Sequence, residues 1–180
     1  MVFTPDTEVA LRSVVNLINS SANGDEQLAT TADLDRFLAA EGFTGSRTRD
    51  AAELASIHRL RGELAGLWLA DEVTAVGTVN RLLREARALP QLVKHDEWDW
   101  HLHATTPEAP LADRMSTEAA MALADVIRSK ERDRMLVCAA EDCDAVVLDL
   151  SRNRSKRYCD TGNCANRAHV AAYRARKAAS

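Results

Sequence analysis

Four cysteines, the strongest candidates for metal ligands in this sequence, all lie in the last quarter of the chain: Cys138, Cys143, Cys159 and Cys164. They form two pairs, with four residues inside each pair and fifteen between the pairs. Two thiolates this close in sequence can occupy one edge of a tetrahedral metal ion, and four thiolates fill its coordination sphere. The spacing therefore predicts a structural Zn²⁺ site with no open position for water or substrate.

Two disulfides, or buried cysteines without a function, are the alternatives to a zinc site. The N-terminus, MVFTPDTEVALRSVV, lacks a basic start followed by an apolar stretch. No run approaches the roughly 20 apolar residues that a membrane helix requires. We therefore expect a soluble, cytoplasmic protein without membrane contact, and the reducing cytoplasm disfavours disulfides.

Charge is distributed unevenly along the chain, whose formal net charge is −4. Residues 1–133 hold 14 basic and 22 acidic residues, whereas residues 134–180 hold 9 basic and 5 acidic ones. The excess is concentrated in eight basic residues: Arg152, Arg154, Lys156, Arg157, Arg167, Arg174, Arg176 and Lys177. A local basic surface attracts polyanions even when the whole chain is acidic.

The elements that must position the cysteines begin with a helical N-terminal part. Apolar residues at helical spacing predict helices at about residues 6–20, from an N-cap at Thr31 to before Gly42, from Thr48 to Trp68, and from an N-cap at Asp71 to before Pro90. A further helix is expected over residues 111–132, with Met115, Ala119, Leu123, Val126 and Ile127 facing inward. Trp68 and the leucines are expected to form an ordinary core.

Residues 91–103 have a different texture and predict a β-hairpin that turns near residues 95–97. Trp98, Trp100 and Leu102 alternate with polar residues, so we expect them on the buried face and His101 and His103 on the solvent face. His95, Asp96, Asp99, His101 and His103 could suggest a second metal site, but the spacing fixes no third ligand. Solvent-facing polar residues explain the pattern better.

The cysteine region itself is expected to be a small α/β module that is stapled by the metal. Residues 135–137 and 145–148 read as strands, SRNRSKR as a basic turn, and the residues from Cys164 onward as a helix. Ala168, Ala171, Ala172 and Ala175 share one helical face, which we expect to lie against the zinc ribbon. Basic side chains flank that face on both sides.

Nucleic-acid binding is the function that this basic module favours. Its candidate contacts are Arg152, Arg154, Lys156, Arg157, Asn166, Arg167, Tyr173, Arg174, Arg176 and Lys177. The alternatives are that the cations of the last turn complement the helix dipole, or that the module is an RNA-binding or protein-interaction adaptor. Glycine-rich phosphate loops and nucleophile elbows are absent, so we expect no enzymatic activity.

The cysteine region resembles the C-terminal zinc finger of the CGNR family, which is named for a Cys-Gly-Asn-Arg motif. The resemblance rests on SRNRSKRYC, on Cys164-Ala165-Asn166-Arg167 and on Tyr173-Arg174-Ala175-Arg176. Members usually carry an N-terminal helical domain called ABATE and are regarded as stress-induced bacterial transcription regulators. Val14-Val15-Asn16 and the Trp98-bearing hairpin fit that domain in outline.

The resemblance implies that the four cysteines are the zinc ligands and that Asn166, Arg167, Arg174 and Arg176 occupy motif positions. Ala165 stands where the motif has Gly. If that position is already helical, Ala is the better residue there. Any backbone contact that the family makes at the Gly is therefore in question.

These observations together predict a mainly α protein with two parts. Residues 1–133 form a multi-helical ABATE-like domain with a small hairpin, expected to sense a small-molecule effector or to mediate dimerisation. Residues 134–180 form a treble-clef-like zinc module that binds DNA. A single module offers little interface, so we expect a homodimer that reads two half-sites.

Overall fold

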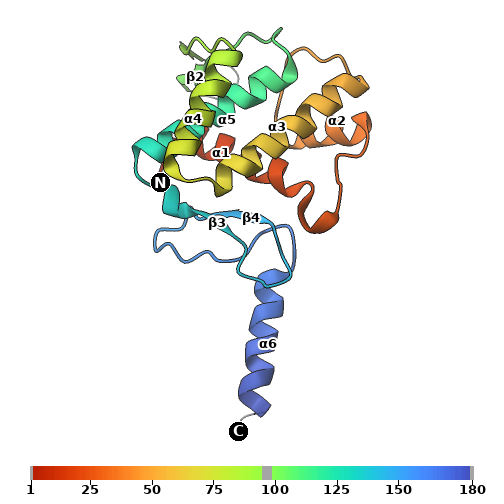
Figure 1. Ribbon diagram of the computed structural model, residues 1–180, viewed down its shortest axis with the longest axis vertical. Coiled ribbons are helices and arrows are strands. Elements are labelled where there is room, and N and C mark those ends of the chain that lie inside the picture. Colours follow the sequence, from red (N-terminus) through yellow and green to blue (C-terminus); the bar gives the residue numbers. More distant parts are fainter. Residues whose placement is uncertain (1, 95–98, 179–180) are drawn as a thin grey trace.

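Six α-helices and two short antiparallel hairpins make up residues 2–94 and 99–178, which the computed structural model describes (Figure 1). Five helices form a body, a small β-module lies against it, and the last helix projects away from both. This arrangement confirms the predicted mainly α class with a small module at the C-terminal end. No helix in the described ranges is long and apolar enough to span a bilayer.

The helices and strands lie close to their predicted positions. The helices are α1 (Pro5–Asn19), α2 (Thr31–Ala40), α3 (Ala51–Leu69), α4 (Glu72–Glu85), α5 (Leu111–Arg128) and α6 (Cys164–Ala178). The strands are β1 (Gln91–Val93), β2 (His101–His103), β3 (Met135–Val137) and β4 (Val146–Leu148). Two 3₁₀ turns, Ala22–Gly24 and Arg132–Arg134, complete the order.

Side-chain caps fix where three of the helices begin. The predicted cap at Asp71 is confirmed, because its carboxylate accepts the Thr74 N–H at 2.9 Å. The predicted cap at Thr31 is wrong by one residue. Thr30 accepts the Asp33 N–H, and Asp33 accepts the Thr30 N–H in return, so the reciprocal capping box selects Thr30.

The body has one hydrophobic core made by the inner faces of α1, α3, α4 and α5. Its fully buried members include Leu11, Leu17, Ile57, Leu64 and Val126. The predicted inward face of α5 is confirmed, with Met115, Ala119, Leu123 and Val126 all buried and Ile127 packed against the core. Trp68 is also buried, as expected.

The hairpin β1–β2 faces the opposite way from the prediction. Leu92 pairs with Leu102 across the ladder, and these two side chains are 66% and 43% exposed. Trp100 is exposed as well, whereas His101 and His103 are half-buried on the face toward the body. The predicted alternation of apolar and polar residues is correct. The predicted buried face is wrong, because the body presents polar groups to this hairpin and the histidines, not the apolar side chains, face it. The predicted turn and Trp98 lie outside the described residues.

The hairpin β3–β4 is joined to the helical body through buried contacts. Val146 and Leu148 belong to the core of the body, while Val147 packs with the cysteines on the other face of β4. The Asn19 side chain donates to the Val146 carbonyl at 2.9 Å and accepts the Val146 N–H at 2.8 Å. The Trp68 indole N–H donates to the Leu136 carbonyl at 3.0 Å. These contacts fix the β-module against the body.

Helix α6 does not pack as predicted. Ala171, Ala172 and Ala175 are exposed, and Cys164 is the one buried residue of the helix within the described range. The helix extends away from the β-module (Figure 1), and of the four alanines on the predicted face only Ala168, near the start of the helix, is half-buried. Small side chains allow close packing, but they do not by themselves supply the apolar area that would drive it.

We expect Asn19→Ala to lower the free energy of unfolding by about 2–4 kcal/mol, because the Val146 N–H and carbonyl would be buried without partners. Urea unfolding followed by circular dichroism measures this loss. Asn80→Ala, on the exposed face of α4, is the matched control and should change stability by less than about 0.5 kcal/mol. Equal effects of the two substitutions would contradict the role given to Asn19.

Candidate metal centre

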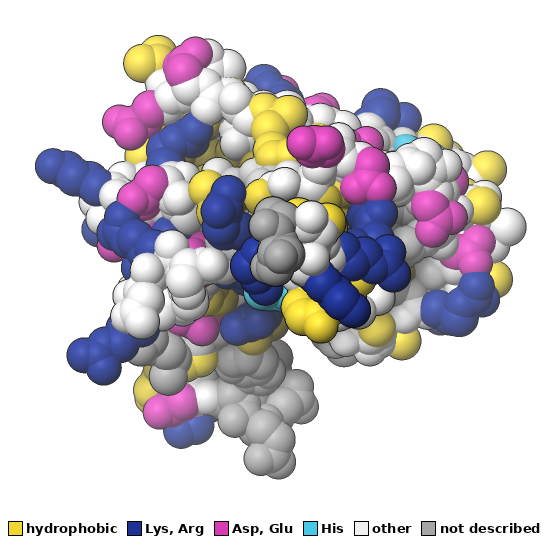
Figure 2. All heavy atoms as spheres, turned by 90° about the horizontal axis from the view of Figure 1, so that it is seen from below, with side chains coloured by type: hydrophobic (Ala, Val, Ile, Leu, Met, Phe, Trp, Pro, Cys, Tyr) yellow, Lys and Arg dark blue, Asp and Glu magenta, His cyan; other side chains and the backbone are white. Residues whose placement is uncertain are grey.

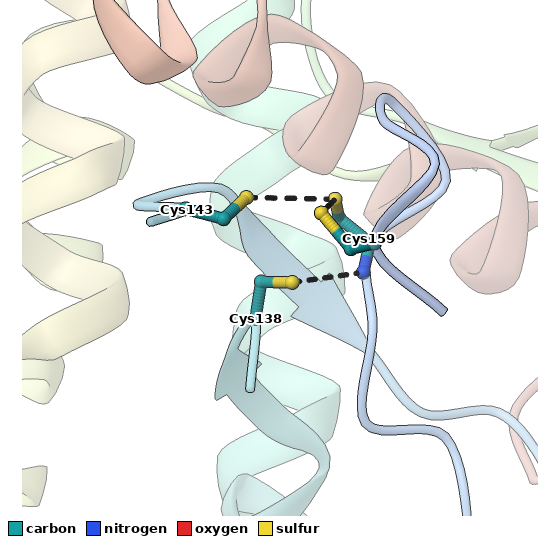
Figure 3. Close-up of side chains that lie close together, drawn as sticks. Cys138, Cys143 and Cys159 are labelled. Atoms are coloured by element: carbon teal, nitrogen blue, oxygen red, sulfur yellow. Dashed lines mark hydrogen bonds between the residues drawn. The ribbon is translucent and has the colours of Figure 1, made fainter. Parts of the chain in front are cut away.

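The four cysteine thiols converge in one small space. All four Sγ atoms lie within 4.8 Å of one another, and all four side chains are buried. The distance is 3.7 Å from Cys143 Sγ to Cys159 Sγ, and also from Cys159 Sγ to Cys164 Sγ. In Figure 3, Cys138 and Cys143 approach Cys159 from the opposite side of the cluster. All four thiols are free in this structure, and the 3.7 Å separations are far longer than the roughly 2 Å of a disulfide bond.

Four separate backbone segments bring these thiols together. Cys138 directly follows β3, and its N–H donates to the Ala145 carbonyl at 2.8 Å. Cys143 ends a tight turn in which its N–H donates to the Ala140 carbonyl. Cys159 lies in the loop after the basic turn, where its N–H points at Cys138 Sγ at 3.4 Å. Cys164 is the first residue of α6, as predicted.

The donor set fits a zinc ion. Zn–S bonds of about 2.3 Å in a tetrahedron place the sulfurs about 3.8 Å apart, close to the 3.7 Å between the two measured pairs. Four buried sulfurs would hold the ion and supply structural cross-linking, without a site for substrate. Within the described ranges, no other group of three or more His, Cys, Asp or Glu side chains is arranged to hold a metal.

The cysteines hold their protons unequally. Burial raises the pKa of Cys143 to about 12. Burial also raises the pKa of Cys159, but hydrogen bonds from the Thr161 hydroxyl and the Gly162 N–H outweigh it, and this pKa falls to about 7. A metal ion must displace the protons that remain, so loading of the site depends on pH.

Arg167 links the cysteine cluster to an acidic residue on the facing loop. Its guanidinium donates to Cys164 Sγ at 3.3 Å and to both carboxylate oxygens of Asp142. The contact with Asp142, followed by that with Cys164, raises the pKa of Arg167, and the guanidinium lowers the pKa of Asp142. Arg167 therefore supports a sulfur ligand in this structure, a position that the sequence assigned to nucleic-acid contact.

Asp149 is a buried carboxylate that sequence reasoning missed. It accepts the Ser151 N–H at 2.8 Å and the Lys156 N–H at 3.0 Å, and so ties down both ends of the basic turn. Burial raises the pKa of Asp149, but the hydrogen bonds from Ser151 and Lys156 outweigh it and the pKa is lowered overall. The sequence indicates this role only weakly, through a single acidic residue that stands shortly before a basic run.

The ten predicted nucleic-acid residues fall into three groups. Three are ion-paired inside the protein: Arg154 with Glu131 and Asp133, Lys156 with Asp160, and Arg167 with Asp142. Arg152, Arg157, Arg174 and Lys177 are exposed, and the described residues offer them no ion pair. Asn166, Tyr173 and Arg176 are exposed on α6. In Figure 2, seen from below, Lys and Arg side chains gather around the projecting end.

Two family models match the chain over adjoining segments. Residues 134–177 match the CGNR zinc finger, and residues 11–130 match ABATE, whose description reads "Putative stress-induced transcription regulator". No curated protein matches the chain. The fold and the thiol cluster thus define a zinc-finger protein with a helical N-terminal part. The ABATE match covers more than half of the chain, and the protein belongs to the ABATE family with a C-terminal CGNR zinc finger.

The two family descriptions bear on the function and on the metal. They support a role in regulation of transcription, and neither description names a catalytic activity. They also support a metal at the cysteine cluster, since one family is defined as a zinc finger. His101 and His103 belong to no metal-binding group among the described residues, and His95 and Asp96 lie outside those residues.

We expect the purified protein to contain one zinc ion per chain, measured by inductively coupled plasma mass spectrometry. A strong chelator should abolish hydrogen-exchange protection of the Cys138 and Cys143 amides, because the metal cross-links their turns. Protection at Leu123, in the middle of α5, serves as the internal control and should persist. Unchanged protection at both cysteines after complete removal of zinc would refute this expectation.

Arg167→Ala should weaken zinc affinity by about 10- to 100-fold, because outer groups that hydrogen-bond to ligands tune metal affinity. Competition with a chromophoric chelator measures the change. Arg174→Ala lies on the same side of α6 but about two turns further from the cluster; it removes the same charge and should leave affinity within about twofold. Equal losses in the two variants would mean that general charge, not the contact with Cys164, is responsible.

Proposed function

We propose that the protein is a DNA-binding regulator of transcription in which α6 is the element that enters the duplex. Residues 134–180 act as the DNA-binding module and residues 1–133 as the part that carries it. The observation that carries the proposal is a basic helix that projects from the body with its side chains exposed. The regulatory description of the ABATE family supports the same function.

The exposure of α6 favours a partner that packs around it. At 1.5 Å per residue, its 15 residues extend about 22 Å, and an isolated helix of that length is marginal in water. The major groove of B-DNA admits one α-helix. The narrow alanine face would permit close approach to base edges, while Arg174 and Lys177 would reach phosphates.

The number of cations without internal ion pairs sets the expected electrostatic contribution to DNA affinity. Four exposed residues, Arg152, Arg157, Arg174 and Lys177, have no ion pair within the described part of the chain. Arg154 is held by two carboxylates and is less available. Four phosphate contacts correspond to a slope of about −4 when log K is plotted against log salt. A homodimer is part of the proposal, because one module offers a small interface.

We expect Arg174→Ala with Lys177→Ala to reduce the salt slope from about −4 to about −2, because two phosphate contacts are lost. Fluorescence anisotropy with a fluorescein-labelled 20-base-pair duplex, titrated at several salt concentrations, measures the slope. Arg154→Ala is the matched control; it removes one positive charge from an internal ion pair and should leave the slope unchanged.

Competition with unlabelled duplex DNA and with structured RNA distinguishes the proposal from an RNA-binding adaptor. Duplex DNA should displace the probe at a lower concentration than RNA of equal length. Stronger displacement by RNA, or a salt slope near zero, would exclude DNA as the partner of this helix. Sedimentation of the complex gives its stoichiometry, which is two chains per duplex if the protein binds as a homodimer.

A further inference from the structure

A half-open cavity lies on the helical body, away from the cysteine cluster. Its volume is about 270 Å³, and it is lined by residues of α1, α5, β2 and the segments of residues 41–44 and 104–107. Val9, Phe43, Met121 and Ala122 supply apolar wall. The cavity is of a size and mixed polarity that suit a small organic molecule.

Acidic side chains outnumber cationic ones around this cavity. The carboxylates are Asp6 from α1, Glu41 from the end of α2, and Glu118 and Asp125 from α5. The only guanidinium is that of Arg114. Glu41 accepts from the Ser13 hydroxyl at 2.5 Å and from the Asn16 amide at 2.8 Å, and both of these donors are neutral. The lining therefore favours a positively charged ligand.

Arg114 is committed to backbone carbonyls and leaves Glu118 without an ion pair. Its guanidinium donates to the carbonyls of Ala109, Thr44 and Ser46. No hydrogen bond or ion pair to Glu118 is found within residues 2–94 and 99–178. Burial raises the pKa of Glu118 to about 7, and the more distant Arg114 charge offsets this only in part. The buried Glu118 carboxylate has lost water without gaining a charged partner, and a bound cation would supply that partner.

The two histidines of β2 line the cavity on the side of the hairpin. His101 Nε2 and His103 Nε2 lie 3.0 Å apart, within hydrogen-bond distance of each other. His101 Nδ1 also lies 2.8 Å from the Asp99 carbonyl. Since both rings face the body rather than solvent, they form a polar wall of the cavity.

We propose that this cavity binds a small organic cation, a protonated amine on an apolar body, with the Glu118 carboxylate as its counter-ion. The amine would take the position opposite Glu118, and the apolar part would lie against Phe43 and Met121. An anion is disfavoured, because three of the Arg114 N–H groups donate to carbonyls and four carboxyl groups line the space. This site is independent of DNA binding by α6.

Benzylamine is a suitable probe, because it joins one protonated amine to one apolar ring. Titration followed by ¹H–¹⁵N NMR should shift the amides of Phe43, Thr44 and Met121 with saturation. Glu118→Gln should weaken binding by at least about tenfold, because a charged hydrogen bond is lost. Glu108→Gln, an exposed acid that does not line the cavity, is the matched control and should bind as the parent protein does.

Ligand charge provides a second test of the same site. Benzyl alcohol and benzoate keep the ring but remove or reverse the charge, and both should bind at least about tenfold more weakly than benzylamine. Equal binding of benzylamine and benzyl alcohol, or equal affinity in the Glu118→Gln variant, overturns the proposal. Absence of saturable benzylamine binding to the parent protein at pH 8 also overturns it.

The pH dependence gives a third readout. Benzylamine stays protonated between pH 8 and pH 6, whereas the ionised fraction of Glu118 falls about tenfold, so its affinity should fall by a similar factor. The charged and titratable groups that face Glu118 are Asp6, Glu41, Asp125, Arg114, His101 and His103. The Glu118→Gln variant keeps all six of them, so a pH dependence that persists in it would assign the effect elsewhere and overturn the role of Glu118.

Thermal unfolding verifies that the variant is folded and that Glu118 is desolvated. The native protein binds the Glu118 proton more tightly than the unfolded chain does, so this group lowers stability as pH rises from the ordinary Glu value toward 7. Glu118→Gln should therefore raise Tm at pH 8, and the gain should shrink toward pH 5. A variant that is less stable than the parent at pH 8 would contradict the environment on which the site depends.

Discussion

Strand β4 belongs to two hydrophobic clusters at once, and the rest of the architecture depends on this. Its alternate side chains point to opposite faces, so Val146 and Leu148 enter the helical core while Val147 packs beside the cysteines. Asn19 holds the same strand through both of its backbone hydrogen-bonding groups at Val146. The cysteine cluster is therefore attached directly to a strand that is buried in the helical core, and the two parts are not joined only by a linker.

The cysteine cluster and the helical body need each other for different physical reasons. The β-module contains two strands of three residues each, which is too little sheet to be stable alone. The body supplies one apolar face, and a metal held by four thiols would close the other. Along most of its length, helix α6 contacts neither the helical body nor the cysteine cluster, since only its first residue is buried within the described range. It is consequently the element whose side chains remain available to a partner.

Electrostatics divides the basic residues of the C-terminal part into those that build the module and those that face outward. Acidic residues of the body side, Glu131 and Asp133, hold Arg154, and Asp142 holds Arg167 against a cysteine. The formal charge of the segment thus overstates the charge that is free to attract a polyanion. For the DNA binding proposed above, the acidic body would repel nucleic acid, which favours an approach from the end of α6 in Figure 2.

The helices, the strands and the paired cysteines could be predicted from the residues alone, because these features depend on local periodicity, caps and ligand spacing. Leu123 and Val126 follow the 3.6-residue repeat, and Asp71 caps α4 wherever that helix packs. Tertiary structure decided which face of each element is covered. The alternation in β2 is the same whether His101 or Leu102 faces inward, and only the polar cavity beneath the hairpin selects the histidines. The partners of Arg154 and Asn19 were equally hidden, since these ion pairs and hydrogen bonds join positions far apart in the sequence, whose approach no local spacing specifies.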